Sequence, residues 1–487
     1  MDNKMLQPPV PQQSLYRQLA THYLEAMKTR VLHPGDKMPS VRALARQHAL
    51  SLSTALQACR FLESEGWLEA RPRSGYFVKS QKRTEIMAVT EPDMSRPHDT
   101  AQFIGIHEKV SEIISMGQRK VRINLGRAAG APELYPGKQL NVLATRELRC
   151  HTDMFSKQSR PTGNVIFKDV LARRALASGM MLNPDDILVT NGCIEALNLA
   201  LRAVAQSGDV IAVESPTFYG LLQVMESLGM RALEIPTSAQ TGISLEALEL
   251  AIQTYDNIKA VVVVPHLQNP LGSIMPEAHK KRLVQLCETS HIALIEDDSY
   301  SALVHDGPPL TSLKAHDMTG NVIHCASLHK ILAPGLRLGW MVAGRWQARV
   351  NMLKYAQTRY NDEWSQTVAG KFMGSPAYDR HLRKIRSALR VQRDLTAEAI
   401  SRHFPIGTRC SLPNGGVSIW VELPAGLSSR KIFEAALVRE ILISPGMLFS
   451  NSQRFDHFIR LNCGMPFSDE VKQAYAELGA IIHTQQT

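Results

Sequence analysis

Residues 325–340 read CASLHKILAPGLRLGW and place one lysine, Lys330, just beyond a short apolar run. Ser327 precedes this lysine, and a proline-glycine turn leads from it to Arg337. A lysine on an exposed helix face needs no such neighbours. In a partly dry site near other cations, a lysine has a lowered pKa, and its free amine can form an imine with an aldehyde. Ser327 and Arg337 could bind a phosphate beside it.

Carboxyl groups end another apolar run. The stretch IALIEDDSY carries Glu296, Asp297 and Asp298 at its end, and Tyr300 lies three residues beyond Asp297. Carboxylates at the end of a buried strand are costly unless a positive group meets them. A protonated heterocyclic nitrogen would meet them. A metal ion is the alternative, but no histidine or further carboxylate lies nearby at the spacing of metal ligands.

Three further runs end in residues that could bind a ligand. The stretch NGCIEAL opens a helix after a glycine loop, and the free N–H groups of a helix N-terminus suit a phosphate. VESPTFYG offers Phe218 as an aromatic face, although a lone phenylalanine more often belongs to the core. VPHLQNPLG offers Asn269 as a neutral hydrogen-bond donor, although alone it is also a turn residue before Pro270.

Pyridoxal phosphate has a part to match each of these motifs. Its aldehyde suits Lys330, its pyridine nitrogen suits the carboxylates, and its phosphate suits the glycine loop, Ser327 and Arg337. Its phenolic oxygen needs a hydrogen-bond donor, and its flat ring needs an aromatic face. Each motif is modest alone, but five in sequence order predict a pyridoxal-phosphate site anchored at Lys330.

The elements that must position these residues are strands alternating with helices. Helical periodicity occurs between several apolar runs, as in 194–207 and 277–290. Alternation of this kind predicts an α/β domain with a largely parallel sheet, whose ligands gather at the carboxyl ends of the strands. The predicted strands are 186–190, 209–215, 259–265, 292–297, 321–327, 339–344 and 416–423.

The first eighty residues have another pattern. Apolar residues four apart predict a helix over 14–30, and LHPGDKMPS then breaks the chain. Ser40 and Ser51 are placed to cap two further helices. These are VRALARQHA at 41–49 and LSTALQACRFLESE at 52–65, ended by Gly66, before two strand-like pieces at 67–71 and 75–79. Three helices and a hairpin in this order predict a winged helix-turn-helix that binds DNA.

Charge agrees with this assignment. The chain of 487 residues has a formal net charge of +10, and residues 1–79 hold 11 Lys and Arg against 6 Asp and Glu. Such an excess of positive charge suits a polyanionic partner, although a basic solvated surface would give the same count. Seven scattered cysteines without a CxxC pair, and a polar N-terminus without an apolar leader, predict a cytoplasmic protein that does not enter a membrane.

From about residue 120 to 487, the chain resembles the fold-type I aminotransferases on these motifs and on FIRLNCG at 458–464. The resemblance implies that Lys330 forms the imine, Asp297 pairs with the pyridine nitrogen, and Phe218 stacks on the ring. Asn269 and Tyr300 would bind the phenolic oxygen. Lys330, Asp297 and Tyr300 would form the catalytic set. The phosphate would be held by Gly192, Cys193, Ile194, Ser327 and Arg337.

Two further positions follow from this resemblance. Arg460 would bind the carboxylate of a substrate or effector, with an ordinary surface ion pair as the alternative. Gln158 stands where many relatives carry a tyrosine, five residues before Gly163. A phosphate or partner-subunit contact of the family would therefore be missing here.

The N-terminal stretch resembles the GntR family of bacterial transcription regulators. The residues that carry the resemblance are PGDKMPSVRALA, SLSTALQA and EGWLEARPRSGYFV. Many relatives have arginines at the start of the recognition helix, where this chain has Leu52 and Leu56. The candidate DNA-binding residues are Arg42, Ser51, Ser53, Thr54, Gln57, Arg60, Arg71 and Arg73.

The combination is similar to the MocR subgroup of bacterial regulators. The expected domains are a winged helix-turn-helix over 1–79, a linker over 80–115, and an aminotransferase-like domain of fold type I over 116–487 with a smaller C-terminal α+β subdomain. The resemblance implies a pyridoxal-phosphate-binding transcription regulator that forms a homodimer with exchanged DNA-binding heads. Its effector would be an amino compound that displaces Lys330 by forming an external aldimine.

Two alternatives remain open. One is an active aminotransferase with an incidental or autoregulatory head, since Lys330, Asp297 and Arg460 are all present. The other is a regulator that senses pyridoxal phosphate itself. The sequence does not identify the effector, the operator, the sign of regulation or whether transamination is physiological.

Overall fold

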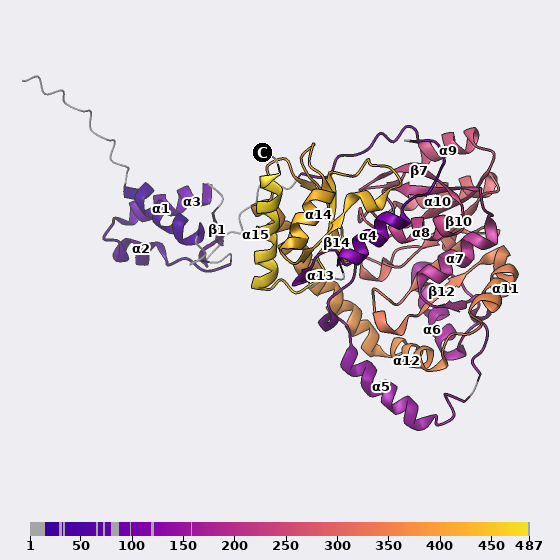
Figure 1. Cartoon of the computed structure of the whole chain (residues 1–487). Helices are drawn as coiled ribbons and strands as arrows, with labels where there is room; N and C mark the ends of the chain where they lie inside the picture. Colours follow the sequence, from indigo (N-terminus) through magenta and orange to yellow (C-terminus); the bar gives the residue numbers. More distant parts are fainter. Residues whose placement is uncertain are drawn as a thin grey trace, which may run out of the picture. The chain divides into compact units, whose positions relative to one another are not determined.

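The structure, a computed structural model, divides the chain into two compact units, Met1–Glu85 and Ile86–Thr487 (Figure 1). Each unit has a hydrophobic core of its own. The residues that the structure describes are 15–28, 32, 35–64, 67–71, 74–78, 87–97, 99–117, 121–156 and 158–485.

The first unit contains three helices and a two-stranded hairpin. The Ser40 hydroxyl accepts a hydrogen bond from the Ala43 N–H at 3.2 Å, and the Ser51 hydroxyl accepts one from the Thr54 N–H at 3.1 Å. The two predicted helix caps are therefore confirmed. The elements are α1 (Leu15–Lys28), α2 (Val41–Gln47), α3 (Leu52–Ser64), β1 (Leu68–Arg71) and β2 (Gly75–Val78). The predicted helix end at Gly66 and the candidate Arg73 lie outside the described residues.

A large, mainly parallel sheet forms the centre of the second unit. Its strand order is β3-β7-β6-β9-β10-β11-β12-β5, with β8 paired to β7. Strands β7, β6, β9, β10 and β11 run parallel to one another, and β12 is antiparallel to both β11 and β5. The strands are β3 (Gln102–Phe103), β5 (Leu188–Thr190), β6 (Val210–Ser215), β7 (Arg231–Ser238), β8 (Gly242–Ile243), β9 (Ile258–Val263), β10 (Ala293–Asp297), β11 (Val322–Ser327) and β12 (Gly339–Val342).

Strand β7 was not predicted from the sequence. Arg231, Glu234 and Pro236 interrupt its apolar pattern, yet most of the strand is buried. Glu234 is tolerated there because its carboxylate accepts hydrogen bonds from the Ser215 hydroxyl at 2.7 Å and the Ser450 hydroxyl at 2.6 Å. Hydrogen bonds from residues distant in sequence cannot be predicted from the pattern of apolar residues along one strand.

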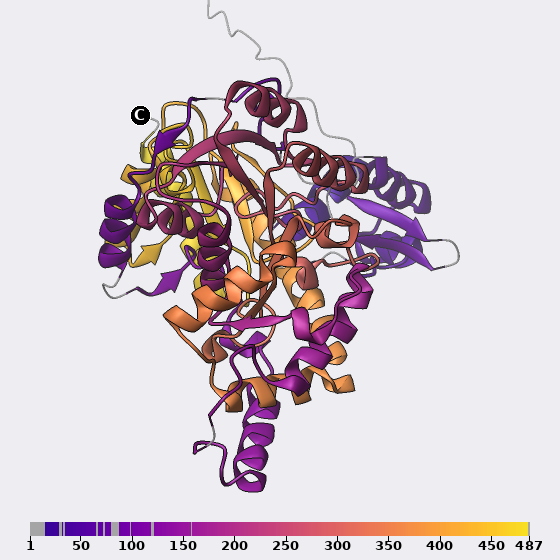
Figure 2. The same ribbon diagram turned by 90° about the vertical axis from the view of Figure 1, so that its right-hand side faces the viewer.

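Helices cover the sheet. The apolar side chains of α7 and α8 share a core with β6, β9 and β10, while those of α6, α12 and α13 share another with β5 and β12. Helix α5 projects from the second unit in both views (Figure 1, Figure 2). The helices are α4 (His107–Gly117), α5 (Gly137–Cys150), α6 (Val165–Ala175), α7 (Cys193–Val204), α8 (Tyr219–Ser227), α9 (Leu245–Thr254), α10 (Glu277–Thr289), α11 (Gln347–Gln357), α12 (Glu363–Met373) and α13 (Pro376–His403).

A smaller α+β subdomain follows the long helix α13, as predicted. Its antiparallel sheet has the order β13-β14-β17-β16, and β15 pairs with β4 (Ile123–Asn124). Its core includes side chains of α14, α15 and β17. The elements are β13 (Arg409–Cys410), β14 (Ser418–Glu422), α14 (Ser429–Val438), β15 (Ile441–Leu442), β16 (Ser444–Pro445), β17 (Phe458–Asn462) and α15 (Asp469–Thr484).

Much of the stretch expected to be a linker packs against the second unit. The backbone N–H of Thr90 donates to the Glu422 carboxylate at 2.7 Å, and that of Ile106 donates to Glu226 at 2.9 Å. Ile106 is fully buried. Polar, proline-containing composition predicted a linker here, but scattered apolar residues are enough to hold an extended segment to a preformed surface. Among the described residues, no helix is both long and apolar enough to cross a membrane.

Candidate functional site

A cavity of about 140 Å³ lies at the carboxyl ends of β9, β10 and β11, next to the start of α7. All ten residues predicted to bind the cofactor line it. The cavity is lined by Gly192, Cys193, Ile194, Leu197, Phe218, Val264, Asn269, Asp297, Ser299, Tyr300, Ser327, His329, Lys330 and Arg337. Parallel strands end at one edge of the sheet, which is why motifs far apart in sequence meet here.

The Lys330 side chain reaches into this cavity from the loop after β11. Its amine donates a hydrogen bond to the Ala128 carbonyl oxygen and lies 5.9 Å from the centre of the Tyr300 ring. Burial, together with the nearby guanidinium groups of Arg460 and Arg127, lowers the pKa of Lys330 to about 7. A large fraction of this amine is therefore neutral and nucleophilic near neutral pH.

Asp297, at the end of β10, is buried and has no cationic partner among the described residues. Its Oδ1 accepts hydrogen bonds from the Ser299 N–H at 3.0 Å and from the Cys193 thiol at 3.3 Å. Burial raises the pKa of Asp297 above its ordinary value. A protonated ring nitrogen placed against it would supply the missing charge.

The start of α7 and Arg337 give the same cavity a place for an anion. Helix α7 starts at Cys193, after Gly192 with φ 82° and ψ 178°, a conformation available essentially only to glycine. A Cβ on Gly192 would lie 3.2 Å from the Arg337 Nη2. Arg337 also donates to the Asn191 carbonyl oxygen at 3.3 Å. A guanidinium group and free helix N–H groups thus face the same space.

One aromatic wall completes the cavity. Phe218 precedes α8 and is half-buried. Its ring folds back over Gly220, where an added Cβ would lie only 2.5 Å from the ring. The glycine therefore allows the ring to take this position. Tyr300 lies in the same cavity, and burial raises its pKa, so that its hydroxyl stays protonated.

Arg460, on β17 of the small subdomain, is fully buried beside this cavity but does not line it. Its Nη1 donates to the Asn269 Oδ1 at 3.0 Å, and its Nη2 donates to the Gly126 carbonyl oxygen at 2.7 Å and the Ser444 hydroxyl at 3.2 Å. The surface ion pair considered as the alternative is not formed: the partners of this guanidinium are neutral groups. Its positive charge is available to an anionic ligand.

Several residues at the site were missed from the sequence. The Cys193 side chain, expected only to offer its backbone to a phosphate, donates to Asp297. Ser299 and His329 also line the cavity, and burial beside Lys330 and Arg337 lowers the pKa of His329 to about 4. Residues 126–128 supply carbonyl oxygens to Arg460 and Lys330. The position of Ser299 next to Asp297 and Asp298 could have indicated a role at the site. The contacts of the backbone carbonyl oxygens could not have been predicted from the sequence.

Gln158, which replaces a tyrosine of many relatives, donates a hydrogen bond to the Tyr360 hydroxyl. Neither residue lines the cavity within this chain. Among the described residues, no group of three or more His, Cys, Asp or Glu side chains is arranged to hold a metal ion.

The candidate DNA-binding residues lie in the first unit. Arg42, Ser53, Gln57 and Arg60 are exposed. The Ser51 hydroxyl also bonds the Ser53 and Thr54 hydroxyls at 2.8 and 2.7 Å, which occupies these three groups with one another. Arg71 is paired with Glu69 at 2.6 Å and stacks on Phe77. Of the candidate arginines, Arg42 on α2 and Arg60 on α3 are exposed.

Known proteins match the two units separately and together. Residues 134–477 match the family described as aminotransferase class I and II, and residues 15–78 match the gntR family of bacterial regulatory proteins. Two uncharacterized HTH-type transcriptional regulators of Escherichia coli (strain K12) match along nearly their whole length. YjiR is 32% identical and YdcR 33% identical, each covering 96% of this chain and 98% of the relative.

Solved structures match the second unit. The kynurenine aminotransferase of Pyrococcus horikoshii, crystallised in complex with PMP, superposes with a TM-score of 0.72 at 27% sequence identity. The match covers 78% of this chain and 95% of that protein. The fold around the cavity is therefore that of an aminotransferase of known structure.

Proposed function

Because this chain belongs to the MocR-type transcription regulators, we propose that it binds pyridoxal phosphate at Lys330 and binds an amino compound, as its effector, at the same site. In these regulators, a GntR-family DNA-binding head is joined to a class I and II aminotransferase domain. The observation that carries this proposal is the position of Lys330. Its amine, with a pKa near 7, shares one cavity with an unpaired buried carboxylate and an anion-binding helix start.

The residues of the cavity fit each part of the cofactor. Pyridoxal phosphate, when bound through its aldehyde, exchanges the protein amine for that of an incoming amino compound. The Lys330 amine provides the attachment point. The Asp297 carboxylate would hold the proton of the ring nitrogen, and Arg337 with the α7 N-terminus would bind the phosphate. Phe218 would cover the ring, and Asn269 and Tyr300 would donate to the phenolic oxygen.

The carboxylate of an amino-acid effector would meet Arg460. An effector bound there would compete with Asn269 for the guanidinium group, and it would span from the large to the small subdomain. The crystallised kynurenine aminotransferase holds PMP, which supports the same cofactor class in this chain. The change in the free energy of DNA binding equals the difference between the effector's binding free energies for two arrangements of the protein.

The first unit would bind double-stranded DNA in its major groove through α3. Ser51, Ser53, Thr54, Gln57 and Arg60 would lie along the groove, with Arg42 on the flanking phosphates. Arg71 and Arg73 of the hairpin would contact the backbone of the DNA. We further propose domains at 1–79, 80–115 and 116–487 and a homodimer that exchanges its heads. A cytoplasmic location follows from access to DNA.

Cofactor binding is tested with Lys330→Ala. The purified protein should carry the visible absorbance of lysine-bound pyridoxal phosphate, and this variant should lose it. Lys472→Ala, an exposed lysine on α15, is the matched control and should keep the absorbance. An unchanged spectrum in Lys330→Ala would refute the cofactor assignment.

An active aminotransferase remains the second candidate, because Lys330 and Asp297 line one cavity and Arg460 is bonded to Asn269 of the same cavity. Sustained transamination with a 2-oxo acid at ordinary enzymatic rates would favour it. A single slow turnover, accompanied by a change in DNA binding, would favour the regulator. A response of DNA binding to pyridoxal phosphate alone would instead favour a sensor of the cofactor.

A further inference from the structure

A second and larger cavity, of about 430 Å³, lies between the end of α6, the loop after β10 and the start of α13. We call it the α6–α13 pocket. Ser299 and Ser327 line both this pocket and the cofactor cavity, so two serines separate the two spaces. Apart from Ser327, predicted to bind the cofactor phosphate, no residue that lines this pocket has a predicted role. Its volume suits a metabolite-sized ligand.

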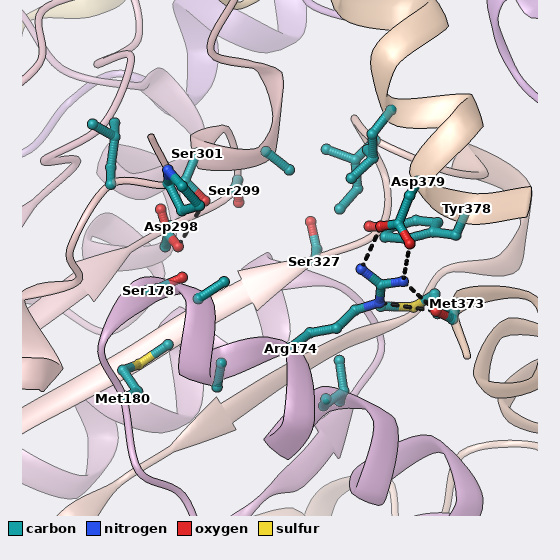
Figure 3. Close-up of a pocket in the computed structure, with 18 of the residues that line it drawn as sticks. Arg174, Ser178, Met180, Asp298, Ser299, Ser301, Ser327, Met373, Tyr378 and Asp379 are labelled. Atoms are coloured by element: carbon teal, nitrogen blue, oxygen red, sulfur yellow. Dashed lines mark hydrogen bonds and ion pairs between the residues drawn. The ribbon is translucent and has the colours of Figure 1, made fainter. Parts of the chain in front are cut away.

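One wall of the pocket is fixed by interactions among its own residues. Figure 3 shows Arg174 bonded to Asp379 and to the Met373 carbonyl oxygen, beside Tyr378. The Arg174 guanidinium lies 2.9 Å from the Asp379 Oδ1 and stacks over the Tyr378 ring at 4.3 Å. These two charges neutralise each other, so they hold the wall in place and leave no charge for a ligand.

Other groups of the pocket are not used by the protein. The Arg386 Nε donates a hydrogen bond to the Ala302 carbonyl oxygen at 2.7 Å. Its two Nη groups have no hydrogen-bond partner among the described residues. Arg383, one turn earlier on α13, is exposed and is likewise unpaired within the described part of the chain. The Tyr378 and Ser327 hydroxyls lack partners among those residues too. The unpaired charge in the pocket is therefore positive.

The negative groups of the pocket are already satisfied. Asp298 accepts from His266 Nδ1 at 2.8 Å and from the Ser301 hydroxyl at 2.9 Å. The remaining surface is largely apolar and comes from Leu171, Ala175, Trp340 and Leu382 among others. A ligand that fills the pocket thus meets guanidinium groups at one wall and apolar side chains elsewhere.

We propose that the α6–α13 pocket binds a small organic anion with an apolar body, next to the cofactor cavity and separate from it. The shared loop couples the two sites, since Ser299 lines both spaces and its N–H donates to Asp297. Only this coupling rests on the proposed cofactor. The binding site itself stands without it.

The test uses the full-length protein saturated with pyridoxal phosphate and the fluorescent probe 8-anilinonaphthalene-1-sulfonate. This probe is an aromatic sulfonate, and saturating cofactor occupies the neighbouring cavity during the titration. Binding should weaken about tenfold in Arg383→Gln and more in the double variant with Arg386→Gln. Arg380→Gln, on the same helix but outside the pocket, is the matched control and should bind as the parent does.

A second pair of variants tests the location without changing charge. Ser178→Trp should fill the pocket and abolish probe binding, whereas Leu176→Trp, exposed and outside the lining, should not. Equal probe affinity in all variants, or displacement of the cofactor by the probe, overturns the site. The same titration in cofactor-free protein separates this proposal from the cofactor assignment. Probe binding should persist there, and only its effect on the visible spectrum should be lost.

Discussion

The Arg460 Nη1 lies 3.0 Å from the Asn269 Oδ1, and both side chains are buried. Arg460 belongs to β17 of the small subdomain, and Asn269 follows β9 of the large sheet. The residue proposed to bind the effector is therefore bonded to a residue proposed to bind the cofactor. A carboxylate that reaches Arg460 must compete with this bond, which gives a direct route from effector binding to a change between subdomains.

Replacing Arg460 by glutamine should remove the preference for carboxylates. The holo-protein would be titrated with L-amino acids and with the matching decarboxylated amines, and the cofactor spectrum would be recorded. A hydrogen bond to a charged group contributes about 1.5–3 kcal/mol, so the preference for the amino acid should fall by about 10- to 100-fold. Arg439→Gln, exposed on the same subdomain, should leave it unchanged. An unaltered preference in Arg460→Gln would remove the carboxylate role.

The rate of cofactor reloading should rise with pH and level off above about 7. Only the neutral amine of Lys330 attacks an aldehyde, and its pKa is lowered to about 7 from the ordinary value of about 10.4. Arg127→Gln removes one nearby positive charge, so the pKa of Lys330 and the midpoint of the profile should move to higher pH. Stopped-flow absorbance of cofactor-free protein mixed with pyridoxal phosphate gives the profile. A rate still rising steeply at pH 9 would contradict it.

Asp297→Asn should weaken cofactor binding by about 10- to 100-fold. The amide cannot supply the negative charge that a protonated ring nitrogen requires in this buried position. Equilibrium dialysis of pyridoxal phosphate measures the change. Asp256→Asn, at an exposed position, serves as the control. Equal affinities of the two variants would show that the ring nitrogen does not use Asp297.

Gly192→Ala should destabilise the protein by about 1–3 kcal/mol and weaken phosphate binding. The φ of 82° and ψ of 178° strain any residue with a Cβ, and the added carbon would approach the Arg337 guanidinium. Urea unfolding gives the change in free energy. Gly137→Ala, at the start of α5, meets nothing within 4 Å and should be neutral or slightly stabilising. An unchanged free energy of unfolding in Gly192→Ala would mean that the loop can relax around the added carbon.

DNA binding should weaken steeply with salt, and Arg42→Gln should flatten this dependence. Each phosphate contact contributes about 0.9 to the slope of log affinity against log salt. One lost contact should therefore reduce the slope by about one and weaken binding to all sequences alike. Fluorescence anisotropy with a labelled upstream fragment measures both. Arg439→Gln again provides the control. An unchanged slope would place Arg42 off the DNA backbone.

The sequence alone determined the α/β class of the large domain and the edge of the sheet where the site forms. Each motif sits at the end of an apolar run, and parallel strands bring their carboxyl ends together whatever the loops between them do. For this reason Lys330, Asp297 and the glycine loop before α7 could be assigned to one cavity. The helix caps Ser40 and Ser51 could be predicted because a cap acts within three residues of itself.

Contacts between distant segments were decided only by the tertiary structure. The bond of Arg460 to Asn269, the Ala128 carbonyl oxygen at Lys330 and the burial of Glu234 join parts of the chain that no local pattern relates. The same holds for the α6–α13 pocket, whose walls come from segments as far apart in sequence as Leu171 and Arg386. Sequence periodicity reports which face of an element is buried, whereas the partners across that face depend on how the elements pack.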